Sequence, residues 1–153
     1  MEHTAVEDVE SFERAGASVR SLTEALGLED VAINHYTLAA GERFSSGMHT
    51  HEDQEEVFYV LSGEAVFETP DGEVTVSAGE AVRFAPGDYQ TGKNAGDETV
   101  EALALGAPKG STDVRVPFPC TECESENLRA IPGDDGFTFE CPECGESFGA
   151  SPV

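Results

Sequence analysis

Two histidines separated by one residue, with a glutamate shortly after them, are the residues in this chain with the clearest chemistry. His49 and His51 flank Thr50, and Glu56 follows after a gap of four residues. On an extended strand, residues two positions apart point to the same face, so both imidazoles would reach one cavity. Two imidazoles and one carboxylate leave open positions on a mononuclear ion, most familiarly iron(II), although manganese, nickel and zinc also fit. The sequence therefore predicts a metal site here.

A second metal site is predicted near the C-terminus, where all four cysteines occur as two Cys-x2-Cys pairs. The pairs are Cys120 with Cys123 and Cys141 with Cys144, and 17 residues lie between them. This spacing is typical of a zinc ribbon, in which two tight turns each supply two thiolates to one zinc ion. A unit of about 35 residues buries too little apolar surface to fold alone, so the metal would stabilise it.

Other interpretations of the four cysteines stay open, namely disulfides, redox-active pairs and a ribbon that reads nucleic acid. The first ten residues are acidic and lack the apolar stretch of a secretory signal, which disfavours disulfides. Neither pair has the βαβ context of a redox motif. Arg129 is almost the only basic residue in a strongly acidic segment, which disfavours nucleic acid. A structural ribbon, or one that contacts another protein, is the favoured interpretation.

The elements that must position these residues are short strands. Strand-forming residues with a period of two occur in six runs, at residues 31–38, 56–61, 65–69, 73–77, 81–84 and 99–105. Turn-forming segments rich in Gly, Pro and Asp separate the runs. This pattern predicts a mainly β fold, either an antiparallel sandwich or a small barrel. Upstream, residues 1–17 are polar and expected to be loosely ordered, and residues 18–27 predict a short helix or turn.

The segment around the two histidines resembles the first motif of the cupin superfamily. That motif reads His-x-His, then three or four residues, then Glu, then six residues, then Gly. His51, Glu56 and Gly63 have this spacing with the four-residue gap. Glu55 fits the three-residue gap but not the glycine, so Glu56 is the better candidate ligand.

A second cupin motif, G-x5-P-x-G-x2-H-x3-N, has a partial counterpart downstream. Three of its positions are in register: Gly79, Gly87 and Asn94. Two depart from it, because Ala85 stands where the proline is expected, with Pro86 one place late, and Gln90 stands where the fourth ligand histidine is expected. The resemblance covers roughly residues 31–105. It implies a cupin-type jelly-roll β-barrel, followed in this chain by the small zinc ribbon.

The resemblance also implies a function and an oligomeric state. A divalent ion such as Fe, Mn, Ni or Zn would be held by the two histidines and Glu56, with Gln90 as a weak ligand or an orienting group. The activity implied is that of a metal-dependent dioxygenase, isomerase or lyase for a small molecule. A non-catalytic binding or sensing module, with the ribbon as a protein contact, and a metal-free structural barrel are the alternatives. Cupin barrels commonly pair, and the strand at 31–38 would offer an edge for a homodimer.

Composition changes along the chain predict its domain organisation. An acidic N-terminal segment with a short helix would span residues 1–30, the barrel 31–106, a linker 107–113 and the zinc ribbon 114–153. The linker is rich in Gly, Pro and Ser, and it has no apolar periodicity.

Charge excludes some partners. Lys and Arg number 8 against 31 Asp and Glu, which gives a net charge of −23 that would repel nucleic acid and anionic membranes. The acids are spread over the whole length, as in haloarchaeal proteins, so a halophilic protein is expected, and an acidic patch for a basic partner is the alternative. No targeting signal or membrane-spanning stretch is visible, so a cytoplasmic protein is expected.

The sequence also predicts the surroundings of four residues that are not expected to be metal ligands. His35 lies in an early strand, and a surface or interface histidine is expected there instead of a ligand. Arg83 is expected to form an ion pair at the surface. Phe58 and Phe84 alternate toward the barrel interior, where most such residues are core and some would contact a ligand.

Overall fold

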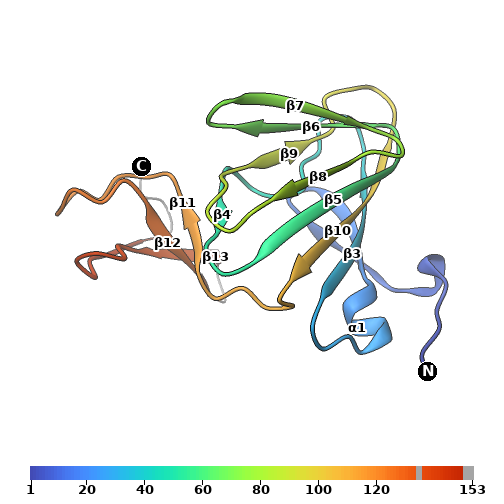
Figure 1. The fold of residues 1–153 in the computed structure, drawn as a ribbon, viewed down its shortest axis with the longest axis horizontal. Coiled ribbons are helices and arrows are strands. Elements are labelled where there is room, and N and C mark those ends of the chain that lie inside the picture. Colours follow the sequence, from blue (N-terminus) through green and yellow to red (C-terminus); the bar gives the residue numbers. More distant parts are fainter. Residues whose placement is uncertain (134–135, 150–153) are drawn as a thin grey trace.

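Almost all of the regular structure is β-strand. A computed structural model describes residues 1–133 and 136–149 of the chain. Figure 1 shows a large β-barrel and, beside it, a smaller sheet built mostly from the C-terminal residues. The prediction of a mainly β fold is confirmed. Residues 134–135 and 150–153 lie outside the described part.

Two antiparallel sheets form the barrel, and they contain all six strands that the alternating pattern predicts. The larger sheet has the order β1 (Ser11–Arg14), β2 (Ala17–Ser21), β3 (Ala32–Leu38), β10 (Val100–Ala107), β5 (Glu55–Ser62) and β8 (Ala81–Phe84). The smaller sheet has the order β7 (Gly72–Ser77), β6 (Glu64–Thr69) and β9 (Thr91–Lys93). Burial alternates strictly along β10, as expected for a strand with one face in the core.

A cluster of aromatic rings fills the interior of the barrel. Phe44, Phe58, Phe67 and Phe84 are at most 7% exposed, and the centroids of contacting rings lie 4.8 to 6.2 Å apart. Gly92 allows β9 to approach this cluster, because a Cβ atom there would lie 2.4 Å from a ring carbon of Phe67. These rings pack mainly on one another, so they are core residues, and little empty space remains inside the barrel.

The N-terminal segment is more ordered than its sequence predicts. Strands β1 and β2 form a hairpin whose turn residues, Ala15 and Gly16, both have positive φ angles, +52° and +90°. All four residues of β1 are exposed, so the strand carries no alternating apolar signal. The larger sheet therefore begins before Val31, where the sequence pattern starts. A short 3-10 helix, Val6–Asp8, precedes the hairpin.

Helix α1 (Leu22–Leu26) is shorter than the helix expected over residues 18–27. Residues upstream of Leu22 belong to β2 and pair with β3, so they are extended. The helix starts where the Ser21 Oγ accepts a hydrogen bond of 3.3 Å from the Glu24 backbone N–H, and it ends at Gly27 in the left-handed conformation. No helix in the two described ranges is long and apolar enough to cross a membrane.

Two expectations about strand β3 are wrong. This strand lies between β2 and β10, so it is not the free edge at which a dimer was expected to form. His35 is flanked on the neighbouring strands by Arg20 and Leu103 and is only 7% exposed, so it is not a surface residue. Because β3 is a central strand, β2 and β10 flank its residues on both sides. The homodimer itself stays a prediction.

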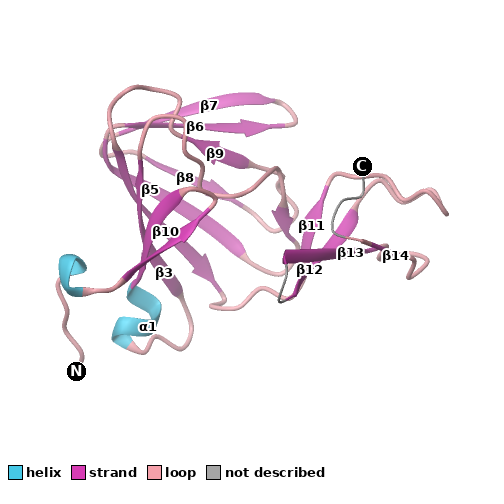
Figure 2. Cartoon of the chain, turned by 180° about the vertical axis from the view of Figure 1, so that it is seen from behind, coloured by secondary structure: helices cyan, strands magenta, loops and turns pink. Residues whose placement is uncertain are grey.

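The C-terminal residues form a separate sheet that extends into the barrel. Its order is β14 (Ser147–Phe148), β13 (Gly136–Glu140), β12 (Leu128–Gly133), β11 (Val114–Val116) and β4 (Thr50–His51). Figure 2 shows this sheet at one end of the barrel. Its small core contains Leu128, Cys120 and Cys141, with five partly buried residues around them, Val116, Phe118, Cys123, Phe139 and Phe148. Strand β4, which carries His51, is the part of this sheet that belongs to the barrel segment.

Candidate metal centres

The three predicted barrel ligands come from adjacent places in the fold. His51 lies on β4, His49 immediately precedes that strand, and Glu56 lies on β5. Gln90 immediately precedes β9 and pairs with His49 through two backbone hydrogen bonds of 3.1 and 2.9 Å. The structure therefore brings together all four residues that the sequence assigns to this site.

The side chains of His49, His51 and Glu56 converge on one point. One ligand atom from each lies within 4.8 Å of the others, and all three residues are half-buried. The two imidazole rings have centroids 5.2 Å apart and an interplanar angle of 77°, so the rings do not clash. The His51 Nε2 lies 3.9 Å from a carboxylate oxygen of Glu56. These separations suit three ligands of one ion.

Hydrogen bonds prepare two of these side chains for metal binding. The His49 Nδ1 lies 2.9 Å from the Gly47 carbonyl oxygen, so Nδ1 carries the proton and Nε2 keeps a free lone pair. The Gln90 Nε2 donates a 3.0 Å hydrogen bond to the Glu56 Oε2. In this arrangement Gln90 orients the carboxylate through its amide nitrogen.

Among the side chains of His49, His51, Glu56 and Gln90, two buried polar atoms have no hydrogen-bond partner within residues 1–133 and 136–149. They are the Nδ1 of His51 and the Oε1 of Gln90. Buried polar atoms are nearly always paired, and an unpaired one in a native protein calls for an ion, a water molecule or a functional role. The donor set and these two atoms therefore fit a bound divalent ion.

Burial sets the electrostatics of the cluster. Loss of solvent, and next the nearby His49, lower the pKa of His51 to about 4. Burial likewise lowers the pKa of His49. The same loss of solvent raises the pKa of Glu56 to about 7, although the hydrogen bond from Gln90 opposes this change. The histidines are therefore neutral at pH 7, as metal binding requires, and Glu56 has a destabilised negative charge that a cation would neutralise.

Glu55, the alternative ligand, points away from this site. Its Oε2 accepts a hydrogen bond of 2.6 Å from the Arg83 Nε, and both side chains are exposed. The ion pair expected for Arg83 is therefore present at the surface, where such pairs contribute little stability. The spacing argument that favours Glu56 over Glu55 agrees with this geometry.

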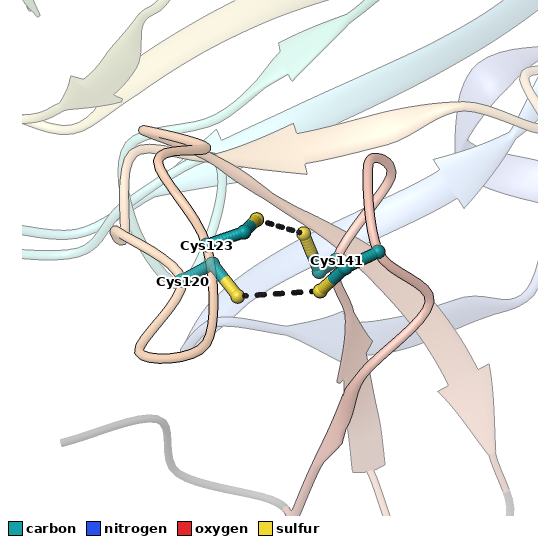
Figure 3. A group of neighbouring side chains, drawn as sticks. Cys120, Cys123 and Cys141 are labelled. Atoms are coloured by element: carbon teal, nitrogen blue, oxygen red, sulfur yellow. Dashed lines mark hydrogen bonds between the residues drawn. The ribbon is translucent and has the colours of Figure 1, made fainter.

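The four cysteine sulfurs also converge on one point, as Figure 3 shows for the facing pairs. The Sγ atoms of Cys120 and Cys144 lie 3.7 Å apart, and those of Cys123 and Cys141 lie 3.5 Å apart. Four sulfurs around a zinc ion at about 2.3 Å would be roughly 3.8 Å from one another. All four are free thiols in this structure, and their arrangement fits a single tetrahedral ion.

Backbone hydrogen bonds shape the two turns that carry these cysteines. The Cys120 N–H donates to the Ser125 carbonyl and the Cys141 N–H donates to the Glu146 carbonyl, both at 2.8 Å. Gly145, which follows the second pair, has a φ of +76°, a conformation that a side chain would strain. The two turns are therefore built alike, as the repeated Cys-x2-Cys spacing predicts.

Sequence reasoning misses the contacts that join the two sites. Asp53 and Asp113 connect the segment after His51 to the beginning of the ribbon through several hydrogen bonds. Both are ordinary members of a very acidic composition, and neither belongs to a motif. Only their partners, far away in the sequence, distinguish them from the many solvated carboxylates.

Comparison with known proteins identifies the class of the barrel. Residues 34–106 match the model of the cupin domain family, and the strands of this part of the chain form a jelly-roll barrel. A crystal structure of a sugar phosphate isomerase from a cupin superfamily, from Silicibacter pomeroyi, has a TM-score of 0.72 at 19% identity and covers 96% of this chain and 97% of that one. A likeness at this identity shows the fold alone.

Two further similar proteins come from Thermotoga maritima. An oxalate-binding protein is 34% identical over 61 residues, which are 40% of this chain and 50% of that protein. The match thus spans about half the length of this curated relative. The crystal structure of a predicted oxalate decarboxylase has a TM-score of 0.58 at 24% identity, over 68% of this chain and 96% of that one. The jelly-roll fold implied by the two motifs is thereby confirmed, and the match of residues 34–106 supports the resemblance to cupins.

Replacing Gln90 by histidine is expected to tighten metal binding at the barrel site. An imidazole at this buried position would add a strong nitrogen ligand beside His49, whereas the amide is a weak one. We expect the dissociation constant for Ni(II) to fall by at least about tenfold, a typical effect of improving the groups around a metal. Isothermal titration calorimetry on both proteins measures this. Equal or weaker binding by the variant would show that Gln90 does not face the ion.

Proposed function

We propose that the barrel holds one divalent metal ion between His49, His51 and Glu56, and that the ion acts on a small ligand in a dioxygenase, isomerase or lyase reaction. The observation that carries this proposal is the convergence of three ligand atoms within 4.8 Å in a half-buried cluster. Two nitrogens and one carboxylate oxygen leave coordination positions free for a ligand. Zinc is the ion proposed for the four cysteines, where it would have a structural role.

Each residue around the cluster has a distinct task in this proposal. The Gly47 carbonyl fixes the tautomer of His49, and the Gln90 amide holds the carboxylate of Glu56. A bound ion would supply positive charge that polarises the ligand and lowers the pKa of its acidic groups. Burial of the surrounding side chains excludes water and strengthens these electrostatic interactions.

The ligand is small, because the barrel has little room for a larger one. The phenylalanine cluster occupies the interior, and the narrow space at the metal site lies between side chains that include Thr50, Gln54, Phe84 and Asp88. A compact dicarboxylate, which can chelate a metal through two oxygens, suits the free coordination positions. The relative that is named an oxalate-binding protein supports this choice.

Binding without turnover is the second candidate function, and one observation favours it. Outside the metal cluster, Asp88 is the only acid among the described residues that line this space. Its Oδ2 accepts a hydrogen bond of 2.8 Å from the Ala85 backbone N–H, so it is engaged in a turn. The site thus lacks a dedicated general base, and a sensing or binding module with the ribbon as its protein contact would need none.

Titration of Mn(II)-loaded protein with oxalate tests the proposed function. We expect oxalate to change the electron paramagnetic resonance spectrum of bound Mn(II), with acetate as a weak comparison because it cannot chelate in the same way. Glu55→Gln is the matched control, since that exposed residue lies outside the cluster and its loss should leave the spectrum unchanged.

Chromatographic analysis of the oxalate after incubation separates the two candidates, because only an enzyme consumes it. Protein that binds no Mn(II) above the background of its surface carboxylates would contradict a metal function of either kind.

A further inference from the structure

The strand that carries His51 belongs to the sheet of the ribbon. In strand β4, His51 pairs with Val114 and Thr50 pairs with Arg115, both on β11. Within the described residues, β11 is the only strand that forms a ladder with β4. On its other side the segment is attached to the barrel by the isolated bridge between His49 and Gln90 and by a hydrogen bond of 3.1 Å from the Gly87 N–H to the His51 carbonyl oxygen. The two histidines therefore lie between barrel and ribbon.

Side chains strengthen this junction just after the second histidine. The Asp53 carboxylate accepts hydrogen bonds from the Ser111 Oγ at 2.6 Å, the Thr112 N–H at 2.7 Å and the Thr112 Oγ1 at 2.9 Å. The Glu52 N–H donates to the Asp113 carbonyl at 2.9 Å. Residues 111–113, which the sequence predicts as the end of the linker, thus hold the chain that leaves His51 in place.

Asp113 connects the same junction to the interior of the ribbon. Its carboxylate accepts two hydrogen bonds from the Arg115 guanidinium, at 2.9 and 2.8 Å, and one from the Arg129 Nε at 3.0 Å. Arg129 lies on β12 and pairs there with Glu140, the residue before Cys141. Leu128, its neighbour, packs in the core that contains Cys120 and Cys141. A continuous set of contacts thus leads from the cysteines to the histidine strand.

From these contacts we propose that the ribbon positions His49 and His51, so that metal binding at the four cysteines raises the affinity of the barrel centre for its own ion. Asp113 is the positioning residue that transmits this effect. The inference rests on the proposed function, because it presumes that the barrel cluster binds a metal.

The physical basis is coupling between two folding events. A ribbon this small needs its metal to stay folded, and an unfolded ribbon cannot keep β11 paired with β4. Freed from β11, the histidine segment would keep only its hydrogen bonds to Gly87 and Gln90, so the His51 side chain would be held less firmly and binding would have to order it. Loss of groups that support ligands typically weakens metal binding by 10- to 100-fold, and we expect a decrease of about this size.

The test compares Mn(II) binding at the barrel of the full chain in the wild type and three variants. Mn(II) is a hard ion that oxygen and nitrogen ligands hold better than thiolates do, so it reports on the barrel. Asp113→Asn and Cys144→Ser should each raise the dissociation constant at least about tenfold and broaden the spectrum of bound Mn(II). Phe137→Ala, at an exposed position of β13, is the control and should change neither.

The outcomes separate the two proposals. Suppose that wild-type protein has a Mn(II) site, and that Asp113→Asn and Cys144→Ser bind Mn(II) with the same affinity and give the same spectrum as the wild type. The proposed coupling is then wrong, and the metal function stands. If wild-type protein has no such site, the proposed function fails and the inference fails with it. Asp113→Asn keeps all four cysteines, so it decides the question even if Cys144→Ser does not fold.

Discussion

Replacing His49 by alanine is expected to lower the bound metal from two equivalents per chain to one, since the residues that the structure describes contain two clusters that could each hold an ion. His49 is the ligand whose tautomer is fixed by Gly47, and its loss leaves one nitrogen and one carboxylate. We expect the affinity of the barrel to fall by at least about a hundredfold, beyond the effect of a supporting group. Elemental analysis after loading with Mn(II) and Zn(II) and dialysis measures both ions.

His3→Ala is the matched control, because that histidine is exposed in the N-terminal segment and should leave both equivalents in place. The ribbon ion should also survive in His49→Ala, since none of its four sulfurs is affected. If wild type and His49→Ala hold the same amount of metal under all loading conditions, the barrel cluster is a set of hydrogen-bonding residues, and the proposal of a metal-dependent function is wrong.

Replacing Glu56 by glutamine is expected to stabilise the metal-free protein at pH 8 while abolishing metal binding in the barrel. Burial raises the pKa of Glu56 to about 7 in the folded state, above the ordinary 4.5, so folding favours the protonated carboxyl. As pH rises from about 4.5 to 7, the wild type loses free energy of unfolding, and above pH 7 the loss is complete. The neutral amide avoids this cost, which is about 3 kcal/mol for such a change in pKa.

Urea unfolding of both proteins in the presence of EDTA at pH 5 and pH 8 measures this difference. The variant should have the larger free energy of unfolding at pH 8 and nearly the same value as the wild type at pH 5. Glu55→Gln, which removes an exposed carboxylate beside the site, should show no such pH-dependent gain. If Glu56→Gln has a smaller free energy of unfolding than the wild type at pH 8, the wild-type carboxylate is adequately solvated or paired without a metal.

Much of the fold follows from local patterns because local forces determine those parts. Alternation predicts the six barrel strands, since strands such as β10 alternate between buried and half-buried residues. The spacing of His49, His51 and Glu56 brings them together because a period of two puts both imidazoles on one face. The cysteine pairs likewise mark their own turns. In each case the signal and the structure that it predicts lie within a few residues.

The remaining features depend on partners that are distant in the sequence. Strand β4 has only two residues, too few to show a period, and it exists because β11 lies beside it. Asp113 cannot be told from its acidic neighbours until Arg115 and Arg129 are placed around it. The exposed strand β1 has no apolar face and is specified by its turn and by β2. The burial of His35 follows from the strands on either side of β3.

The pairing of β4 with β11 has a further consequence for solubility. Without the ribbon, the backbone N–H and C=O groups that β4 now directs toward β11 would face solvent, close to a buried apolar interior. Such unpaired strands recruit strands from other molecules, and many proteins prevent this with charges, prolines or bulges. In this chain the ribbon covers those groups. A shortened chain that ends before Val114 would therefore retain every barrel residue named above and yet be prone to aggregation.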